Sequence, residues 1–196
     1  MLALRHPLAS KGVFFDLEGR RYETTLKFHP LVDPAQVVDV TQFTEDYADD
    51  PIRTFEVLVE SIRKEITSKK YELIVIDGIS DIRRMAADKW CVDHNRERPK
   101  TAGDWNQINM DTKDVIFRVF NYARVLKKYV VVTSLITDEY RKGEATGRKI
   151  PDCKEYIMAR ADEVFYTKSE DLRFYVRRKK SPRGPTDWID ITEEQQ

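Results

Sequence analysis

The segment from Tyr71 to Asp81, YELIVIDGISD, constrains the fold of this chain more than any other stretch. Leu73 to Ile76 form an uninterrupted apolar run, which is typical of a strand buried on both faces of a parallel sheet. The run ends in Asp77 and Gly78, so the strand carries a carboxylate to its C-terminal tip, where open α/β sheets place their ligands. Asp77 is therefore a candidate magnesium ligand beside the phosphates of a nucleotide. The alternative is that it caps the next helix.

A second candidate strand, Val13 to Gly19 (VFFDLEG), also ends in acidic residues. Between the two strands, Asp50 and Pro51 predict the start of a helix, because aspartate is a good N-cap and proline suits the first helical position. The apolar residues that follow recur at helical spacing: Phe55, Leu58, Val59, Ile62 and Ile66. Because strand, helix and strand alternate, we expect a parallel sheet with the helix packed on it.

The same alternation continues along the chain. A long helix is expected from Trp105, with an apolar stripe made of Val115, Val119, Tyr122, Ala123 and Leu126. It leads into a third buried strand, Tyr129 to Leu135, in which Thr133 and Ser134 stand near the tip. We interpret the polar segment 88–101 as an exposed loop or a frayed helix end. The charged segment 136–151 is interpreted as a long surface loop, and loops of this length are often functional.

The last third of the chain changes character. Glu163–Thr167, Leu172–Arg178 and Asp187–Ile191 are short β-type segments separated by turn residues. This pattern predicts an antiparallel meander that finishes the sheet. We therefore expect one α/β domain over residues 1–196, with a mostly parallel sheet flanked by helices and with the meander, 164–191, in the same domain.

Charge and composition limit the partners that the chain can have. Its 196 residues contain 34 basic and 34 acidic side chains, so attraction to nucleic acid has to come from local clusters. One such cluster lies between Leu172 and Thr186, which holds six basic residues and no acidic one. No apolar run reaches membrane-spanning length and no secretory signal opens the sequence, which predicts a cytoplasmic protein without a membrane partner. The two cysteines fit a reducing compartment.

The order of these motifs resembles the core of the RecA-like P-loop ATPases. DLEG closes the first strand, IVIDG the second and VTS the third, and a late hairpin carries RRKK. The nearest likeness is to the phage recombination ATPases, of AAA or RecA type, that are associated with single-strand annealing proteins. The resemblance covers nearly the whole chain, and it implies ATP and Mg²⁺ as cofactors and single-stranded DNA as a partner.

The resemblance also implies roles for individual residues. Glu18 matches the glutamate that polarises the attacking water, and Asp77 matches the aspartate that completes the magnesium site. Thr133 or Ser134 matches the polar residue that senses the γ-phosphate. The basic residues that would reach a neighbouring subunit's nucleotide are Arg177, Arg178, Lys179 and Lys180. Glu18 has a simpler interpretation as a turn residue before Gly19, and the basic run has one as a solvated hairpin.

One defining motif of that superfamily is absent, because the sequence contains no G-x-x-x-x-G-K-[ST] loop to hold the phosphates. The segment from Leu2 to Gly12 resembles the link that follows this loop, so the resemblance implies an N-terminally truncated core without its first strand. We therefore expect ATP hydrolysis to be weak or absent in this polypeptide. A sheet without that strand would expose an edge, which favours self-association.

The long charged segment is the candidate DNA contact. Tyr140 could stack on a base, and basic side chains follow it in the sequence. The candidate nucleic-acid-binding residues are Tyr140, Arg141, Lys142, Arg148 and Lys149. DNA would then lie along the segments that follow Asp81 and Leu135.

Other interpretations compete with the ATPase. The first is a non-catalytic RecA-paralogue module that serves oligomer assembly or DNA contact. The second is a nuclease that uses Asp16, Glu18 and Asp77, although no lysine has the spacing that such sites prefer. The third is a zinc site at Cys91 and His94, for which only Cys153 is left as a further thiol. The three tryptophans are most simply core residues: Trp90, Trp105 and Trp188.

Overall fold

The computed structural model describes residues 6–17, 32–39, 49–141, 144–152, 157–158, 160–171 and 173–192. The chain divides into two compact units, Met1–Cys153 and Lys154–Gln196. In the described residues each unit has sheets of its own. No helix in this part of the chain combines the length and the apolar character that a bilayer crossing requires.

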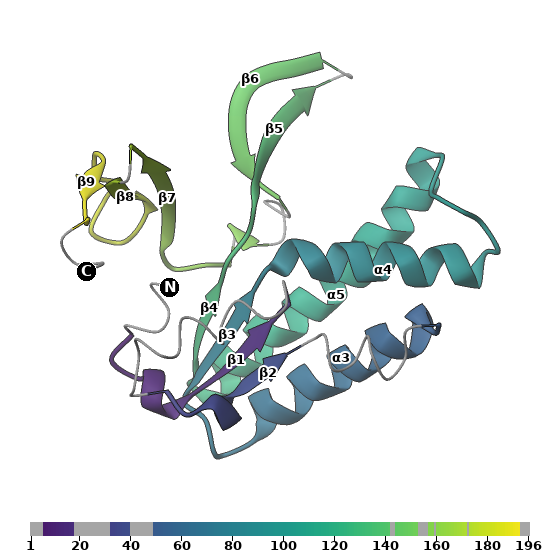
Figure 1. Cartoon of the computed structure of the whole chain (residues 1–196), viewed down its shortest axis with the longest axis horizontal. Coiled ribbons are helices and arrows are strands. Elements are labelled where there is room, and N and C mark those ends of the chain that lie inside the picture. The colour runs from purple at the N-terminus through teal and green to yellow at the C-terminus, as the bar shows by residue number, and fades with distance from the viewer. Residues whose placement is uncertain are drawn as a thin grey trace. The chain divides into compact units, whose positions relative to one another are not determined.

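The first unit is built on a parallel sheet of four strands in the order β2-β1-β3-β4 (Figure 1). Phe14 of β1 pairs in register with Val75 of β3, and Asp16 pairs with Asp77. These central strands are almost entirely buried. Their parallel pairing confirms the α/β class and the parallel sheet predicted from the alternation of strands and helices. The four strands are β1 (Gly12–Asp16), β2 (Val37–Asp39), β3 (Leu73–Asp77) and β4 (Tyr129–Val132).

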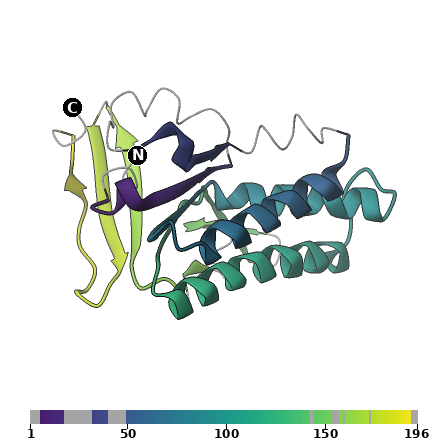
Figure 2. The ribbon, with the colours of Figure 1, turned by 90° about the horizontal axis from the view of Figure 1, so that it is seen from below.

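The two faces of this sheet are covered differently. On one face, Phe14, Leu73 and Val75 pack with Ala9, which belongs to one of two short 3-10 helices, and with Val32, which precedes the other. Those helices are η2 (Ala9–Lys11) and η3 (Pro34–Gln36). Because side chains alternate along a strand, the remaining apolar residues of β1 and β3 point to the opposite face. Figure 2 shows the long helices formed by the described residues of this unit along that opposite side.

The three helices are α3 (Pro51–Thr67), α4 (Ile79–Asp93) and α5 (Ala102–Leu126). Asp50 caps α3 as predicted, since its carboxylate accepts a hydrogen bond of 2.9 Å from the backbone N–H of Arg53. Residues 88–93 form the end of α4 and 94–101 are irregular, so the segment interpreted as an exposed loop or a frayed helix end is a helix end followed by a loop. α5 begins at Ala102, three residues before Trp105, after the N-cap Thr101.

The start of α5 is a capping box. The Thr101 hydroxyl accepts from the backbone N–H of Asp104, and the Asp104 carboxylate accepts from the N–H of Thr101. Backbone N–H groups of Lys100 and Thr101 favour the ionised carboxylate and hold the pKa of Asp104 below its usual value. The predicted stripe of α5 is only partly correct, because Tyr122 and Leu126 are 37% and 43% exposed.

The segment predicted as a surface loop is an antiparallel hairpin, which corrects the sequence interpretation. Its strands are β5 (Ile136–Arg141) and β6 (Glu144–Pro151). The hairpin follows directly from the end of β4 and extends away from the parallel sheet (Figure 1). The register shifts between Asp138 and Tyr140, which is the irregularity expected of a β-bulge.

The second unit contains an antiparallel sheet in the order β7-β8-β9. Its strands are β7 (Val164–Glu170), β8 (Arg173–Lys180) and β9 (Ile189–Asp190). The predicted meander is confirmed, but it pairs with no strand of the parallel sheet in the described residues, so the expectation that it finishes that sheet is wrong. Of the predicted core tryptophans, only Trp90 is buried, whereas Trp105 and Trp188 are 38% and 37% exposed.

Candidate functional site

The C-terminal edge of the parallel sheet carries a row of polar side chains. Asp39 of β2 is in register with Asp16 of β1, which is in register with Asp77 of β3. Ile76 pairs with Val132, so Thr133 stands beside Asp77 at the end of β4. We call Asp39, Asp16, Asp77 and Thr133 the acidic edge. Three neighbouring strands thus end at the same level in a carboxylate, and the fourth is followed by a hydroxyl.

Asp77 and Thr133 are joined directly. The Thr133 hydroxyl donates a hydrogen bond to Asp77 Oδ1 and accepts one of 2.8 Å from the backbone N–H of Gly78. The backbone N–H of Ile79 donates to the Thr133 carbonyl at 3.0 Å. Thr133 therefore fixes both the carboxylate at the tip of β3 and the turn that follows it.

Gly78 allows the sharp turn from β3 into α4. Its φ is +90°, a conformation that glycine adopts readily and other residues rarely do. Gly78 is also the N-cap of α4, so Asp77 does not occupy the capping position and the capping interpretation of this residue is wrong. The Asp77 side chain, half-buried, is available for another role at the edge.

The other candidate carboxylate, Glu18, lies outside the described residues. The chain leads toward it from the acidic edge, because the backbone N–H of Leu17 donates to the Asp77 carbonyl at 3.0 Å. Asp16, the residue before Leu17, is only 1% exposed. The pairing of Glu18 with Asp77 stays a prediction, as does the nuclease interpretation that requires Glu18.

The oxygen atoms at this edge suit a magnesium ion. Mg²⁺ prefers oxygen ligands and is usually held by one or two carboxylates, with water and phosphate oxygens completing its shell. Asp77 offers one carboxylate and Thr133 a neighbouring hydroxyl. Among the described residues no three His, Cys, Asp or Glu side chains converge as a metal site, so a metal here would depend on a phosphate ligand.

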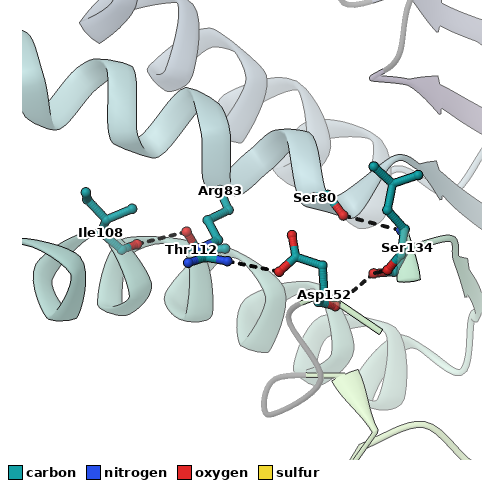
Figure 3. Close-up of polar contacts among 7 residues, drawn as sticks. Ser80, Arg83, Ile108, Thr112, Ser134 and Asp152 are labelled. Atoms are coloured by element: carbon teal, nitrogen blue, oxygen red, sulfur yellow. Dashed lines mark hydrogen bonds and ion pairs between the residues drawn. The ribbon is translucent and has the colours of Figure 1, made fainter. Parts of the chain in front are cut away.

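A second polar cluster lies beside the acidic edge, at the base of the hairpin (Figure 3). Ser134, the residue after Thr133, donates from its hydroxyl to the Asp152 carbonyl at 2.8 Å. The backbone N–H of Asp152 donates to the Leu135 carbonyl at 2.8 Å, and the Leu135 N–H points to the Ser80 hydroxyl at 3.4 Å. These contacts attach both ends of the hairpin to the tip of β4 and the first turn of α4.

Arg83 completes this cluster from α4. Its Nη1 donates to Asp152 Oδ1 at 2.9 Å, and the two side chains are 33% and 22% exposed. The guanidinium also lies 5.2 Å from the centre of the Trp105 ring on α5. Arg83 Nε is buried without a hydrogen-bond partner among the described residues. We call Arg83, Asp152 and Ser134 the hairpin clamp.

The candidate DNA-binding residues lie on this hairpin. Tyr140 and Arg141 belong to β5, where they pair with Ala145 and Glu144. Arg148 and Lys149 of β6 are exposed, and Lys149 makes an ion pair of 2.8 Å with Asp138 across the hairpin. Lys142 lies outside the described residues. The hairpin thus brings predicted DNA-binding residues onto one element whose base adjoins the acidic edge.

The basic residues predicted to reach a neighbouring nucleotide lie on β8 of the second unit. The Arg177 guanidinium lies over the rings of Tyr166 and Trp188, with its carbon 5.7 and 4.8 Å from their centres. Lys180 Nζ donates to the carbonyls of Met158 and Ala161 at 2.9 and 2.6 Å. Both side chains therefore have partners within their own unit. The role of the four residues, Arg177, Arg178, Lys179 and Lys180, in nucleotide binding stays a prediction.

His94, one of the residues weighed as a zinc ligand, packs against Trp90. The two rings stack with centroids 4.3 Å apart, and His94 Nδ1 lies 2.9 Å from the Trp90 carbonyl. Burial raises the pKa of the Cys91 thiol, which disfavours the thiolate that binds zinc. Cys153 lies outside the described residues.

Sequence reasoning missed Arg83 and Asp152, because an ion pair between residues far apart in the chain leaves no local pattern. A weak signal existed for Asp39, which ends a short β-type segment just as Asp77 does. No protein-family model matches this chain, and no curated protein matches it significantly.

Proposed function

We propose that the chain is a RecA-like nucleotide-binding core of a DNA recombination or replication protein that acts on single-stranded DNA. The observation that carries the proposal is the joined pair at the acidic edge, in which the Thr133 hydroxyl donates to Asp77 at neighbouring strand tips. A carboxylate and a hydroxyl so placed suit a magnesium-bound triphosphate. The edge is also the place where parallel sheets bind ligands.

In this proposal each residue of the edge has one task. Asp77 would hold the magnesium ion, which when bound would supply charge neutralisation at the phosphates. Thr133 orients the Asp77 carboxylate, which takes its one hydroxyl hydrogen. Glu18 accepts a proton from the attacking water, the role that the family resemblance implies. The hairpin clamp adjoins the same strand tip, so DNA on the hairpin would lie close to the nucleotide.

The chain contains no glycine-rich lysine loop, and we expect slow hydrolysis for that reason. Loss of a single preorganised donor costs ~10²–10³-fold in rate, and the whole phosphate cradle is missing here. The position of β4 supports a further strand supplied from outside the described residues. The residues of β4, Tyr129 to Val132, are apolar, as is typical of a strand inside a sheet. β4 nevertheless stands at one end of the strand order.

Nucleotide binding is tested by thermal unfolding of the full chain with ATPγS, with and without Mg²⁺. We expect a small increase in melting temperature that requires Mg²⁺ and that is lost in Asp77→Asn. The matched control is Asp114→Asn, which removes one carboxylate from the exposed face of α5. Weakening of binding by about tenfold or more is expected for Asp77→Asn alone.

Two results would contradict the proposal. One is the absence of any Mg²⁺-dependent response to ATPγS at millimolar concentration, and the other is an equal loss in Asp114→Asn. Turnover is measured separately, with and without single-stranded DNA. Rapid hydrolysis that Glu18→Gln abolishes would show that the expectation of weak hydrolysis is wrong.

The second candidate function is a non-catalytic module for oligomer assembly or DNA contact. It is favoured by the side chains of Arg177 and Lys180, which make their contacts within the second unit. The ATPγS experiment separates the two functions. A binding module would keep its affinity for single-stranded DNA and show no nucleotide response, even after a phosphate-binding loop is fused to the N-terminus.

A further inference from the structure

One face of the second unit's sheet combines aromatic rings with cations. In the register of β7 and β8, Tyr166 stands opposite Arg177 and Lys168 stands opposite Tyr175. Trp188, which precedes β9, joins both pairs. We call these five residues the aromatic–cation face. A ring thus lies beside a cation in both cross-strand pairs, which follow each other along one face with their rings diagonal to each other.

The contacts on this face are close enough to hold the rings in place. Lys168 Nζ lies 5.0 Å from the centre of the Tyr175 ring and 5.2 Å from that of Trp188. Arg177 is placed in the same way between Tyr166 and Trp188. Cations within about 6 Å of a ring centre are attracted by its π electrons. The rings and cations of this face therefore already contact one another before any ligand binds.

This arrangement is incomplete as a packed core. Trp188 keeps 37% of its surface exposed, although a buried position was expected for it. Arg177 Nε is buried without a hydrogen-bond partner among the described residues. Lys168 is partly neutralised by Glu170, whose pKa the hydrogen bond from Lys168 lowers, whereas Arg177 makes no ion pair among the described residues. Exposed aromatic surface beside a cation is suited to a planar, anionic ligand.

We propose that the aromatic–cation face binds single-stranded nucleic acid, with Trp188 stacking on a base and Arg177 contacting the adjacent phosphate. Bases stack on aromatic side chains of sheet surfaces in several unrelated folds, because every base has a π face. Side chains two residues apart on a strand are spaced by about 6–7 Å, which an extended single strand can match. A duplex hides its base faces and does not fit this surface.

This inference does not depend on the proposed nucleotide site. It assigns Arg177 to a nucleic-acid surface in place of a neighbouring subunit's ATP. It also adds a second contact to that expected at the hairpin. Failure of ATPγS binding would leave it intact, and failure of stacking at Trp188 would leave the acidic edge intact.

The first test uses the intrinsic fluorescence of the full chain. Trp105→Phe leaves Trp188 as the exposed tryptophan, because Trp90 is 4% exposed. Titration with a 20-mer of deoxythymidine is expected to quench this emission, and a 20-mer of uridine shows whether RNA is also bound. A blunt 20-base-pair duplex at the same phosphate concentration is expected to cause little quenching. Binding of the oligonucleotide without quenching would overturn the proposal.

The second test measures affinity by fluorescence anisotropy with the labelled deoxythymidine 20-mer. Trp188→Ala is expected to weaken binding by about 5- to 50-fold, because stacking on one aromatic side chain contributes that much. Trp188→Phe keeps a stacking ring and should stay within about threefold of the wild type. The matched control is Phe165→Ala, since Phe165 is 52% exposed on β7 and its position next to Tyr166 turns it to the other face.

The outcomes separate a binding role from a structural one. If Trp188→Ala and Phe165→Ala weaken binding equally, or if neither does, the aromatic–cation face is not the binding surface. Should Trp188→Ala unfold the second unit, Lys168→Gln and the quenching experiment still decide, since neither removes a ring of this face. Lys168→Gln is expected to reduce affinity and to flatten its dependence on salt.

Discussion

At the scale of single residues, Thr133 does more than its sequence position suggests. Its hydroxyl both donates to the Asp77 carboxylate and accepts from the Gly78 N–H. A hydroxyl with one hydrogen and two lone pairs can do both at once. Thr133 thereby connects β4 to the turn that starts α4, and it orients the carboxylate on which the proposed magnesium site depends.

Replacing this hydroxyl gives a direct stability prediction. Thr133→Val keeps the shape of the side chain but leaves the Asp77 carboxylate and the Gly78 N–H without their partner. We expect a loss of about 1–3 kcal/mol in the free energy of unfolding, measured by urea denaturation. Thr133→Ser keeps the hydroxyl and is expected to lose less than about 1 kcal/mol. Equal losses in the two variants would mean that the methyl group, not the hydrogen bond, is what matters.

Individual side chains also show which parts of the site a sequence can reveal. Asp77 was predicted because an apolar run that ends in an acid is a local pattern, and the structure places it at the C-terminal tip of a buried strand. The partnership of Asp77 with Thr133 follows from the strand order β3-β4, which the sequence only implied. The pair Arg83 and Asp152 has no local pattern at all, since 69 residues separate them.

At the scale of elements, the helices and central strands were predictable and the hairpin was not. Capping by Asp50 and apolar spacing along α3 are strong local signals, and both are present in the structure. β5 and β6 are charged and lack clean alternation, so their sequence resembles a loop. The two segments become strands because they pair with each other, and this context is not visible in the sequence of either segment alone.

The hairpin clamp leads to a prediction about local opening. Arg83→Gln removes the charge and the ion pair with Asp152 while keeping a polar side chain at the same position on α4. Hydrogen exchange of the backbone amides in 136–151 is expected to become about three- to fivefold faster, since partly exposed ion pairs contribute roughly 0.7–1 kcal/mol. Amides of β1 and β3 should keep their exchange rates.

The matched control for this experiment is Arg118→Gln, which breaks an ion pair with Asp114 on the exposed face of α5. It removes the same charge from a helix and is expected to leave the hairpin amides unchanged. If Arg83→Gln speeds exchange equally in β3 and in the hairpin, the ion pair stabilises the whole unit and does not act as a clamp.

At the scale of the whole molecule, the number of sheets is what the sequence did not predict. The meander was expected to extend the parallel sheet, but β7, β8 and β9 pair only with one another in the described residues. Strand segments can be recognised from turn residues and β-type composition, whereas the partner of an edge strand is chosen by long-range packing. The class of the fold was therefore predictable, and the association of its strands was not.

An exposed apolar patch on the first unit predicts self-association. Val125, Leu126 and Tyr129, at the end of α5 and the start of β4, are 77%, 43% and 59% exposed. This patch lies beside β4, which stands at one end of the strand order and pairs only with β3 among the described strands. An apolar surface next to an open strand edge favours contact with a second chain.

Sedimentation velocity of the full chain between about 1 and 100 µM tests this prediction. We expect the average mass to increase with concentration, and we expect Val125→Glu to weaken association by about tenfold or more, because a buried carboxylate without a partner is costly. The matched control is Val92→Glu, which places the same charge at a 49% exposed valine near the end of α4. A monomer at every concentration would contradict the prediction of self-association. An equal effect of the two variants would contradict the location of the interface, because only an interface at the patch of Val125, Leu126 and Tyr129 makes Val125 the more sensitive position.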